Sequence, residues 1–187
     1  MLLAVIAVAL GAAAGLLAGR RPPAAGDVPA GADVVLLVGG CGAALAGGRL
    51  PGRYVPLALT LAGYALLITF ALRQRRHPGM VAGAAGLTAN MVVMAADRGM
   101  PVSTLAAGTS AGLHHGLSAA DHLRGLADVI PITYLGLTAS PGDLVLAFGA
   151  AVAVFGWLRP RVPAATDRPS APDRTGPPGT GRPAVRP

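Results

Sequence analysis

The sequence contains no lysine and no glutamate: all 15 basic residues are arginine and all 8 acidic residues are aspartate. Charged residues make up only 12% of the chain and hydrophobic residues 53%, whereas an average soluble domain carries about 25% charged residues. The long apolar runs also lack the charged face of an amphipathic surface helix. This shortage of charge argues against a soluble domain and predicts an integral membrane protein.

Other scarce residues narrow the class of protein further. Cys41 is the single cysteine, so no disulfide can form within the chain. Aromatic residues make up 4% of the chain, and the net charge of +7 forms no basic face interleaved with aromatics, so we expect no nucleic-acid partner. No charged residue lies in the middle of an apolar run, which argues against a proton-coupled transporter but not against a passive pore.

Five apolar runs predict an all-α, polytopic bundle of transmembrane helices within residues 1–158, because a spanning helix needs about 20 mostly apolar residues. The runs cover residues 1–19, 34–48, 54–72, 78–96 and 144–158. The second run has only 15 uncharged residues and spans fully only if Arg49 snorkels. The first run could be a cleaved signal peptide, but the basic residues that precede such a core are absent.

The arginines predict how the bundle is oriented, since basic residues gather on the cytoplasmic side. With five spans, eleven of the 15 arginines fall on the side of the C-terminus. The chain is therefore predicted to have its N-terminus outside and its C-terminus in the cytoplasm. Residues 159–187 hold eight prolines, six arginines and no apolar run, which predicts a disordered cytoplasmic tail.

Small residues recur at helical spacing in the first run, at Gly11, Gly15 and Gly19. A similar stripe follows in the second run, at Gly39, Ala43 and Gly47. Such stripes let two backbones approach closely, which favours helix association in lipid. They predict packing inside the bundle and leave a homo-oligomer open.

Residues 98–142 form a connection too long to be a structureless loop. Its apolar stretches, at residues 126–132 and 134–137, predict an ordered outer loop between the fourth and fifth spans. Ser118 and Asp121 have the spacing of a capping box, which predicts a short surface helix. Its apolar face would hold Leu123, Leu126 and Ala127.

The fourth span contains an amide side chain and is followed by a turn-forming motif. Asn90 lies inside this span, and an intramembrane amide is expected to bond a neighbouring helix. In Gly99-Met100-Pro101, the proline favours an extended Met100 and therefore ends the helix.

Ser140-Pro141-Gly142-Asp143 precedes the fifth span. Pro141 and Gly142 suit the central positions of a type II turn. Asp143 would then cap the fifth helix and complement its positive end.

The loop also contains a group of histidines and aspartates: His114, His115, Asp121, His122 and Asp128. Several recur every seven residues, so a continuous helix could align them as metal ligands. Glycines interrupt that pattern, and a solvated loop or a pH-sensitive histidine contact explains it equally well. Residues 108–112 match the nucleophile-elbow pattern, which requires a preceding strand that the sequence does not predict. We predict no metal, no cofactor and no catalytic residue.

Three short motifs around the last two spans resemble those of one bacterial membrane family. The motifs are residues 99–102, residues 126–131 and residues 140–143. The second ends in Pro131, and Asn90 adds to the resemblance. The chain resembles domain of unknown function fifty-three seventeen over residues 1–158, with Ala127 where the family usually has glycine. The resemblance implies a bacterial plasma (inner) membrane protein, and it implies no activity.

Two functions fit these observations. One is a non-enzymatic scaffold or accessory subunit whose outer loop contacts a protein partner or the lipid bilayer. The alternative is a membrane enzyme acting on a lipid-linked or cell-envelope substrate at the outer interface. In the enzyme, His122, Asp128 and Asp143 would converge.

Overall fold

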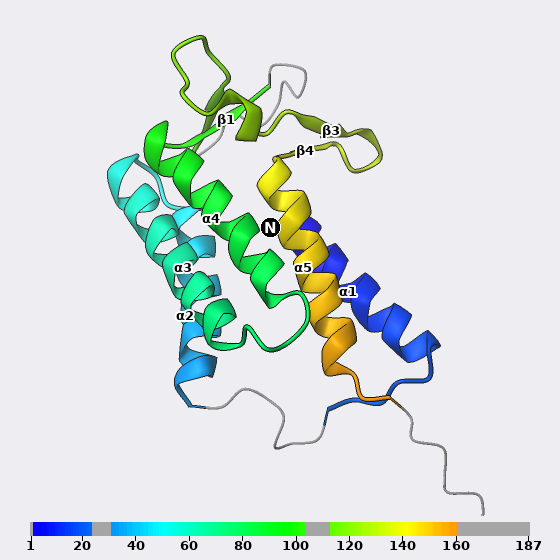
Figure 1. Ribbon diagram of the computed structural model, residues 1–187. Coiled ribbons are helices and arrows are strands. Elements are labelled where there is room, and N and C mark those ends of the chain that lie inside the picture. The colour runs from blue at the N-terminus through cyan, green and yellow to red at the C-terminus, as the bar shows by residue number, and fades with distance from the viewer. Residues whose placement is uncertain (1, 24–30, 104–112, 161–187) are drawn as a thin grey trace, which may run out of the picture.

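The computed structural model describes residues 2–23, 31–103 and 113–160 (Figure 1). Helices make up most of it. They are α1 (Leu2–Leu17), α2 (Ala32–Gly47), α3 (Tyr54–Arg73), α4 (Met80–Ala96) and α5 (Pro141–Trp157). Between α4 and α5 lie the strands β1 (Met100–Val102), β2 (His114–Gly116), β3 (Ile130–Ile132) and β4 (Leu137–Ala139), with two short 3₁₀ turns, η3 (Arg124–Leu126) and η4 (Thr133–Leu135).

Each of the five predicted apolar runs coincides with a helix, although α2 and α5 begin two and three residues before their runs. Arg49 lies beyond the end of α2 rather than inside it. Within the described residues, only the 20-residue α3 is both long and apolar enough to cross a membrane by length and composition. The other four helices are apolar but have 16 or 17 residues.

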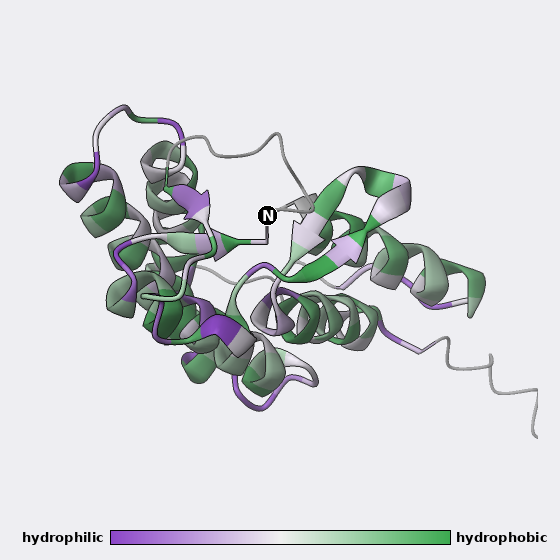
Figure 2. Ribbon diagram, turned by 90° about the horizontal axis from the view of Figure 1, so that it is seen from above, coloured by the Kyte–Doolittle hydropathy of each residue, from purple (hydrophilic) through white to green (hydrophobic). Residues whose placement is uncertain are grey.

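The helices pack in the series α2–α3–α4–α5–α1, so the two N-terminal helices lie at opposite ends of an arc. Helices α1 and α5 run in the same direction, because Gly11 packs on Ala151 and Gly15 on Leu158. The segment from β1 to β4 covers one end of the arc, and we call it the cap (Figures 1 and 2).

Close glycine contacts hold the arc together, because a missing side chain lets two helix backbones meet. The predicted stripe of α1 is confirmed at Gly11 and Gly15, whereas a β-carbon on Gly19 would meet nothing within 4 Å. The stripe predicted on α2 is confirmed at Gly47 but not at Gly39, which is exposed, or at Ala43, which is half-buried. The packed face instead holds Gly40 and Ala44, one position further along. Alanine and glycine are so common in α2 that the sequence does not reveal which face turns toward α3.

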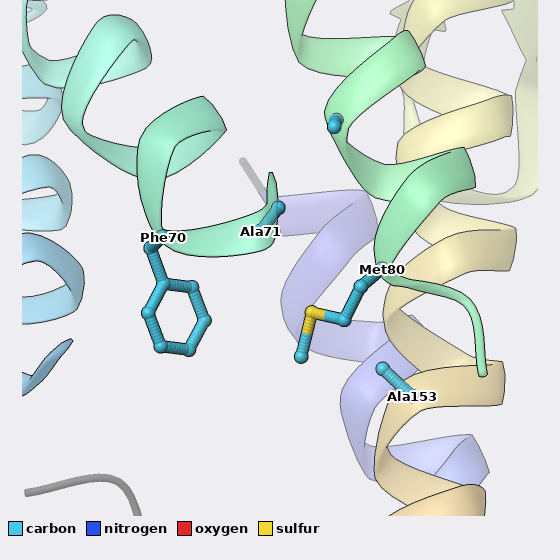
Figure 3. Close-up of a cluster of buried hydrophobic side chains, with 5 residues drawn as sticks. Phe70, Ala71, Met80 and Ala153 are labelled. Carbon is cyan, nitrogen blue, oxygen red and sulfur yellow. The ribbon is translucent and has the colours of Figure 1, made fainter. Parts of the chain in front are cut away.

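Two apolar clusters fill the spaces between the helices. At the end away from the cap, Phe70 of α3, Met80 of α4 and Ala153 of α5 are buried together, and Figure 3 shows Met80 between the other two. Beneath the cap, Val93 and Met94 pack with Met100 of β1. The cap therefore rests directly on α4.

The cap is built from two short sheets. Strands β1 and β2 pair in parallel, with Met100 opposite His114, and β3 and β4 pair antiparallel, with Ile130 opposite Ala139. The extended conformation predicted for Met100 is confirmed. None of these pairings was predicted, because three-residue strands carry too few side chains to show alternation.

The surface helix predicted after Ser118 is absent from the cap. The predicted side-chain contact does form, since the Ser118 N–H donates to Asp121 Oδ2 over 2.6 Å. However, the N–H of His122 donates to Asp97 Oδ1 over 2.9 Å instead of to a helical carbonyl. The chain forms only the short turn η3, and the predicted apolar helix face is wrong.

Polar contacts join the helices at the end away from the cap. Asp33 of α2 accepts from Arg73 Nε over 2.6 Å and from Gln74 Nε2 over 2.8 Å. Arg20 Nη1 donates to the carbonyls of Phe155 and Leu158, over 3.0 and 2.9 Å. Because the last carbonyls of a helix lack partners and carry partial negative charge, Arg20 caps the C-terminal end of α5.

The contact between α4 and α5 supplies a first test. A β-carbon on Gly149 would lie 2.9 Å from the Gly83 α-carbon, whereas one on Gly42 would meet nothing within 4 Å. We expect Gly149→Ala to lower the unfolding free energy by about 1–3 kcal/mol, as overpacking does. Gly42→Ala, the matched control, should be neutral or slightly stabilising. Equal thermal unfolding midpoints for the two variants would contradict the close contact.

Candidate functional site

A cavity of about 340 Å³ lies beneath the cap. Residues from α2, α3, α4, the cap and the first turn of α5 line it together. Its polar lining consists of Arg49, Thr60, Tyr64, Asn90, His114, Asp128 and Asp143. We call this the polar pocket. It collects two carboxylates, an imidazole and a guanidinium in a protein that has few such groups.

Asn90 fixes one wall of the polar pocket by joining α4 to α5. Its side-chain amide donates to Asp143 Oδ1 over 2.8 Å, and its Oδ1 accepts from the Ser140 hydroxyl over 2.9 Å. Asn90 is 3% exposed and Ser140 is fully buried. The expectation that Asn90 bonds a neighbouring helix is confirmed.

The start of α5 differs from the sequence prediction. Ser140 is the N-cap, Pro141 opens the helix, and Gly142 lies inside its first turn rather than in a type II turn. Ser140 Oγ accepts from the Asp143 N–H over 2.9 Å, and Asp143 Oδ2 accepts from the Ser140 N–H over 3.3 Å. This is a capping box with aspartate in the glutamate position. The prediction that Asp143 would be the cap was therefore wrong, although its negative charge does lie at the positive end of the helix.

Asp128 enters the polar pocket from the cap. Its N–H donates to the Pro101 carbonyl over 2.9 Å, and its own carbonyl accepts from Ser103 over 3.0 Å. The neighbouring Ala127 is fully buried with φ −69°. Alanine therefore fits at this position, since no positive φ is required there.

The Asp128 carboxylate is 8% exposed. Its Oδ1 is buried without a hydrogen-bond partner within the described structure. Its Oδ2 lies 3.8 Å from His114 Nε2, which is beyond hydrogen-bond distance. Burial, and then the nearby Asp143 carboxylate, raise the pKa of Asp128 to about 7.

Thr60 adds a second unsatisfied group to the same pocket. Its side chain is on α3, and the described residues offer its buried Oγ1 no hydrogen-bond partner. Buried polar groups without partners are costly and rare. Thr60 Oγ1 lies against Gly47, so the unsatisfied Asp128 Oδ1 is the stronger indication that a polar ligand would complete the pocket.

The other two loop histidines lie in separate pairs. His115 Nε2 lies 3.1 Å from Asp121 Oδ1, and His122 Nδ1 lies 3.0 Å from Asp97 Oδ1. Of the interpretations that the sequence left open for these residues, alignment along a continuous helix is excluded, because the segment from β2 to η3 is not helical. Among the residues that the structure describes, no group of three or more His, Cys, Asp or Glu side chains could hold a metal.

Hydrogen bonds perturb both of these aspartates. A backbone N–H from Ser118 and then the His115 side chain lower the pKa of Asp121, against the opposing effect of burial. Burial is the largest influence on Asp97 and would raise its pKa, but the bonds from His122 and Leu123 together lower it. Both carboxylates are therefore held ionised as structural anchors of the cap.

The structure separates the candidate residues of the sequence motifs. Asn90, Asp128 and Asp143 line the polar pocket, whereas His122 does not. Met100 and Pro101 are buried in β1, and Pro131 is exposed on β3. The nucleophile-elbow pattern at residues 108–112 lies outside the described residues, as does the tail from residue 161. Sequence reasoning missed Arg49, Thr60 and Tyr64. Only the four-residue spacing of Thr60 and Tyr64 in an apolar helix could have indicated a shared polar face.

Comparison with known protein families gives a match. Residues 43–155 match the model of DUF5317, a family of unknown function. The matched region begins within α2 and ends in α5, so it contains the whole cap and the residues around the polar pocket. No curated protein and no solved structure gives a significant match.

Removing the Asn90 amide tests the contact between α4 and α5. Asn90→Ala leaves the Ser140 hydroxyl and the Asp143 carboxylate without this partner, so we expect a loss of about 1–3 kcal/mol in unfolding free energy. Thr88→Ala is the control, because the Thr88 hydroxyl only bonds the Ala84 carbonyl of its own helix. If both substitutions lower the unfolding midpoint equally, Asn90 does not hold the helices together.

The raised pKa of Asp128 predicts a pH dependence with a definite sign. The folded protein keeps the Asp128 proton up to a pKa of about 7, whereas the unfolded chain loses it near 3.8. This residue therefore makes the fold less stable as the pH rises from about 4 to 7. We expect the wild-type protein to lose stability between pH 5 and pH 8, and Asp128→Asn to remove the part of this loss that Asp128 causes. The measurement is the thermal unfolding midpoint, which should differ by several degrees. Asp97→Asn is the control: because the pKa of Asp97 is lowered, this variant should still lose stability between pH 5 and pH 8. An unchanged pH profile in Asp128→Asn would contradict the assignment.

Proposed function

The chain belongs to the DUF5317 family, and on that premise we propose that it is a five-span membrane protein. In this proposal it acts without catalysis, as a scaffold or accessory subunit that binds a polar group beneath its outer cap. The bilayer is that of a bacterial plasma membrane, with the cap and N-terminus outside and the C-terminus in the cytoplasm.

Exposed apolar side chains support the membrane assignment. Every helix of the arc exposes at least one large apolar side chain by more than half, and water would not tolerate so many. Examples from α1 to α5 are Leu10, Val35, Val55, Val81 and Phe148. Helices of 16 or 17 residues cross the roughly 30 Å core if the flanking arginines snorkel or the bilayer thins locally.

Charge placement supports the orientation. Alternating helix directions place six described arginines at the end away from the cap: Arg20, Arg21, Arg73, Arg75, Arg76 and Arg159. Only four, Arg49, Arg53, Arg98 and Arg124, lie at the cap end. By the positive-inside rule, this excess supports placing the end away from the cap in the cytoplasm. Tyr134, fully exposed at the tip of the β3–β4 hairpin, suits the headgroup level of the outer face.

The observation that carries the binding role is the unsatisfied Asp128 Oδ1 in the polar pocket. Burying a carboxylate oxygen without a hydrogen-bond donor costs free energy, and a ligand that donates to it would offset that cost. Asn90 and the capping box hold the adjacent wall rigid. A rigid pocket with unused polar atoms favours binding of a small polar group.

An enzyme acting on an envelope substrate is the second candidate. Asp128 and His114 in one pocket could exchange protons near neutral pH, since the pKa of Asp128 is about 7. His122, which this hypothesis also needs, is instead paired with Asp97. The described lining of the pocket also contains no serine or cysteine nucleophile. We therefore favour binding over catalysis.

Cysteine labelling tests the membrane topology. In a Cys41→Ser background, Arg124→Cys would place a thiol on the cap and Arg75→Cys a thiol at the opposite end. A membrane-impermeant maleimide should label the first in intact cells and the second only after permeabilisation. Labelling of both from the same side, or a folded monomer in detergent-free buffer, would refute the proposal.

A further inference from the structure

A second cavity, of about 250 Å³, lies inside the arc of helices. Its lining is almost wholly apolar and comes from all five helices, for example Val8, Leu37, Leu67, Leu87 and Val154. We call it the apolar groove. Tyr64 and Asp143 line both the polar pocket and the apolar groove. The two compartments therefore meet at the first turn of α5.

The apolar groove is long and narrow. It reaches from Asp143 in the first turn of α5 to Trp157 at its last residue. That distance is about 21 Å at the helical rise per residue, which exceeds the roughly 15 Å of one hydrocarbon leaflet. Its volume is too small for another helix, which is about 10 Å across. A single extended acyl chain matches the length of the groove.

The arc also leaves an entrance for such a chain. Helices α1 and α2 both line the groove but stand at opposite ends of the packing series. Within the described residues they do not pack on each other as the other neighbours do. An acyl chain can therefore enter the groove from the surrounding lipid, between α1 and α2. Gly83 leaves further room, since a β-carbon there would meet nothing within 4 Å.

The polar pocket selects the head group. Among the described residues the buried Asp128 Oδ1 has no hydrogen-bond partner, and Asp143 lies on the adjacent wall of the pocket. Arg49 lies at another part of the lining. An ammonium group would donate to the carboxylates, and an adjacent phosphate would bind the guanidinium. A primary ammonium suits this site because it has three N–H donors, whereas a quaternary one has none.

Resting on the proposed membrane function, the geometry points to a specific ligand: we propose that the protein holds one aminophospholipid of the outer leaflet. Its ammonium binds Asp128, its phosphate binds Arg49, and one acyl chain fills the apolar groove. The occupant is a bilayer phospholipid with an ethanolamine-type head group. A second copy of this chain would not fit the groove, and an anionic lipid would face the two carboxylates.

The test is lipid retention, measured by native mass spectrometry of the full-length protein in mild detergent. The protein is offered equal amounts of phosphatidylethanolamine and phosphatidylcholine with identical acyl chains at pH 8. We expect one bound lipid and about a tenfold preference for the ethanolamine head group, the ratio that about 1.4 kcal/mol supplies. Equal retention of the two lipids would overturn the head-group assignment.

Two variants separate the compartments. Asp128→Asn should abolish the preference while lipid is still retained, because the apolar groove is intact. Gly83→Leu fills the groove and should abolish retention, whereas Gly42→Leu, whose β-carbon also meets open space outside the groove, should not. Retention that survives Gly83→Leu would refute the groove as the acyl-chain site.

The outcomes also distinguish this inference from the proposed function. If cysteine labelling gives the expected topology but the wild-type protein retains no lipid, the membrane proposal stands and the lipid ligand is refuted. If labelling contradicts the topology, both proposals fail. Retention of phosphatidylglycerol above phosphatidylethanolamine would show that Arg49, not Asp128, selects the head group, and would overturn the ligand proposed here.

Discussion

The buried side-chain amide of Asn90 is the interaction on which the rest of the structure depends. It reaches from α4 to both members of the capping box that begins α5. Asn90 and Ser140 are both buried, so water does not compete for these hydrogen bonds. The amide thus fixes where α5 begins. That start in turn fixes the position of Asp143 in the polar pocket and the path by which β4 leaves the cap.

Small residues and a few charged side chains hold the rest of the helices together. Glycines bring the backbones of neighbouring helices together, so packing is closest where side chains are missing. Charged side chains act at the far end, where Arg73 holds Asp33 and Arg20 caps α5. This division leaves large apolar side chains free to point outward. It also concentrates nearly all internal polarity beneath the cap, which is why the polar pocket stands out chemically.

The sequence predicted the helices because each is an unbroken apolar run bounded by charge or proline. It also predicted the local chemistry of Asn90 and of Asp143. It could not predict contacts between distant segments, such as β1 with β2 or Asp128 with the Asp143 region. Such contacts depend on how the cap folds back over the helices, and the pattern of apolar residues in the sequence carries no information about that path. The helix expected after Ser118 failed for a related reason: Asp97, more than twenty residues earlier, takes the backbone N–H of His122.

The same limit applies to the glycine stripes. On α1 the spacing of glycines identified the packed face at Gly11 and Gly15. On α2 two neighbouring stripes of small residues are almost equivalent in sequence, and only the structure shows that Gly40 and Ala44, rather than Gly39 and Ala43, face α3. In a chain this rich in alanine and glycine, small-residue spacing predicts that helices pack, but it selects the correct face only where one stripe has no rival.

The packing of α1 on α5 has a consequence for how the molecule is made. Chain synthesis proceeds from the N-terminus, so α1 is made long before α5, the helix on which it packs. In the proposed membrane, α1 would lie among lipid tails without this neighbour until α5 is made. Its composition suits such an interval, since α1 carries no charged or amide side chain. Helix α5 then supplies the packing surface, and Arg20 donates to the carbonyls at its end.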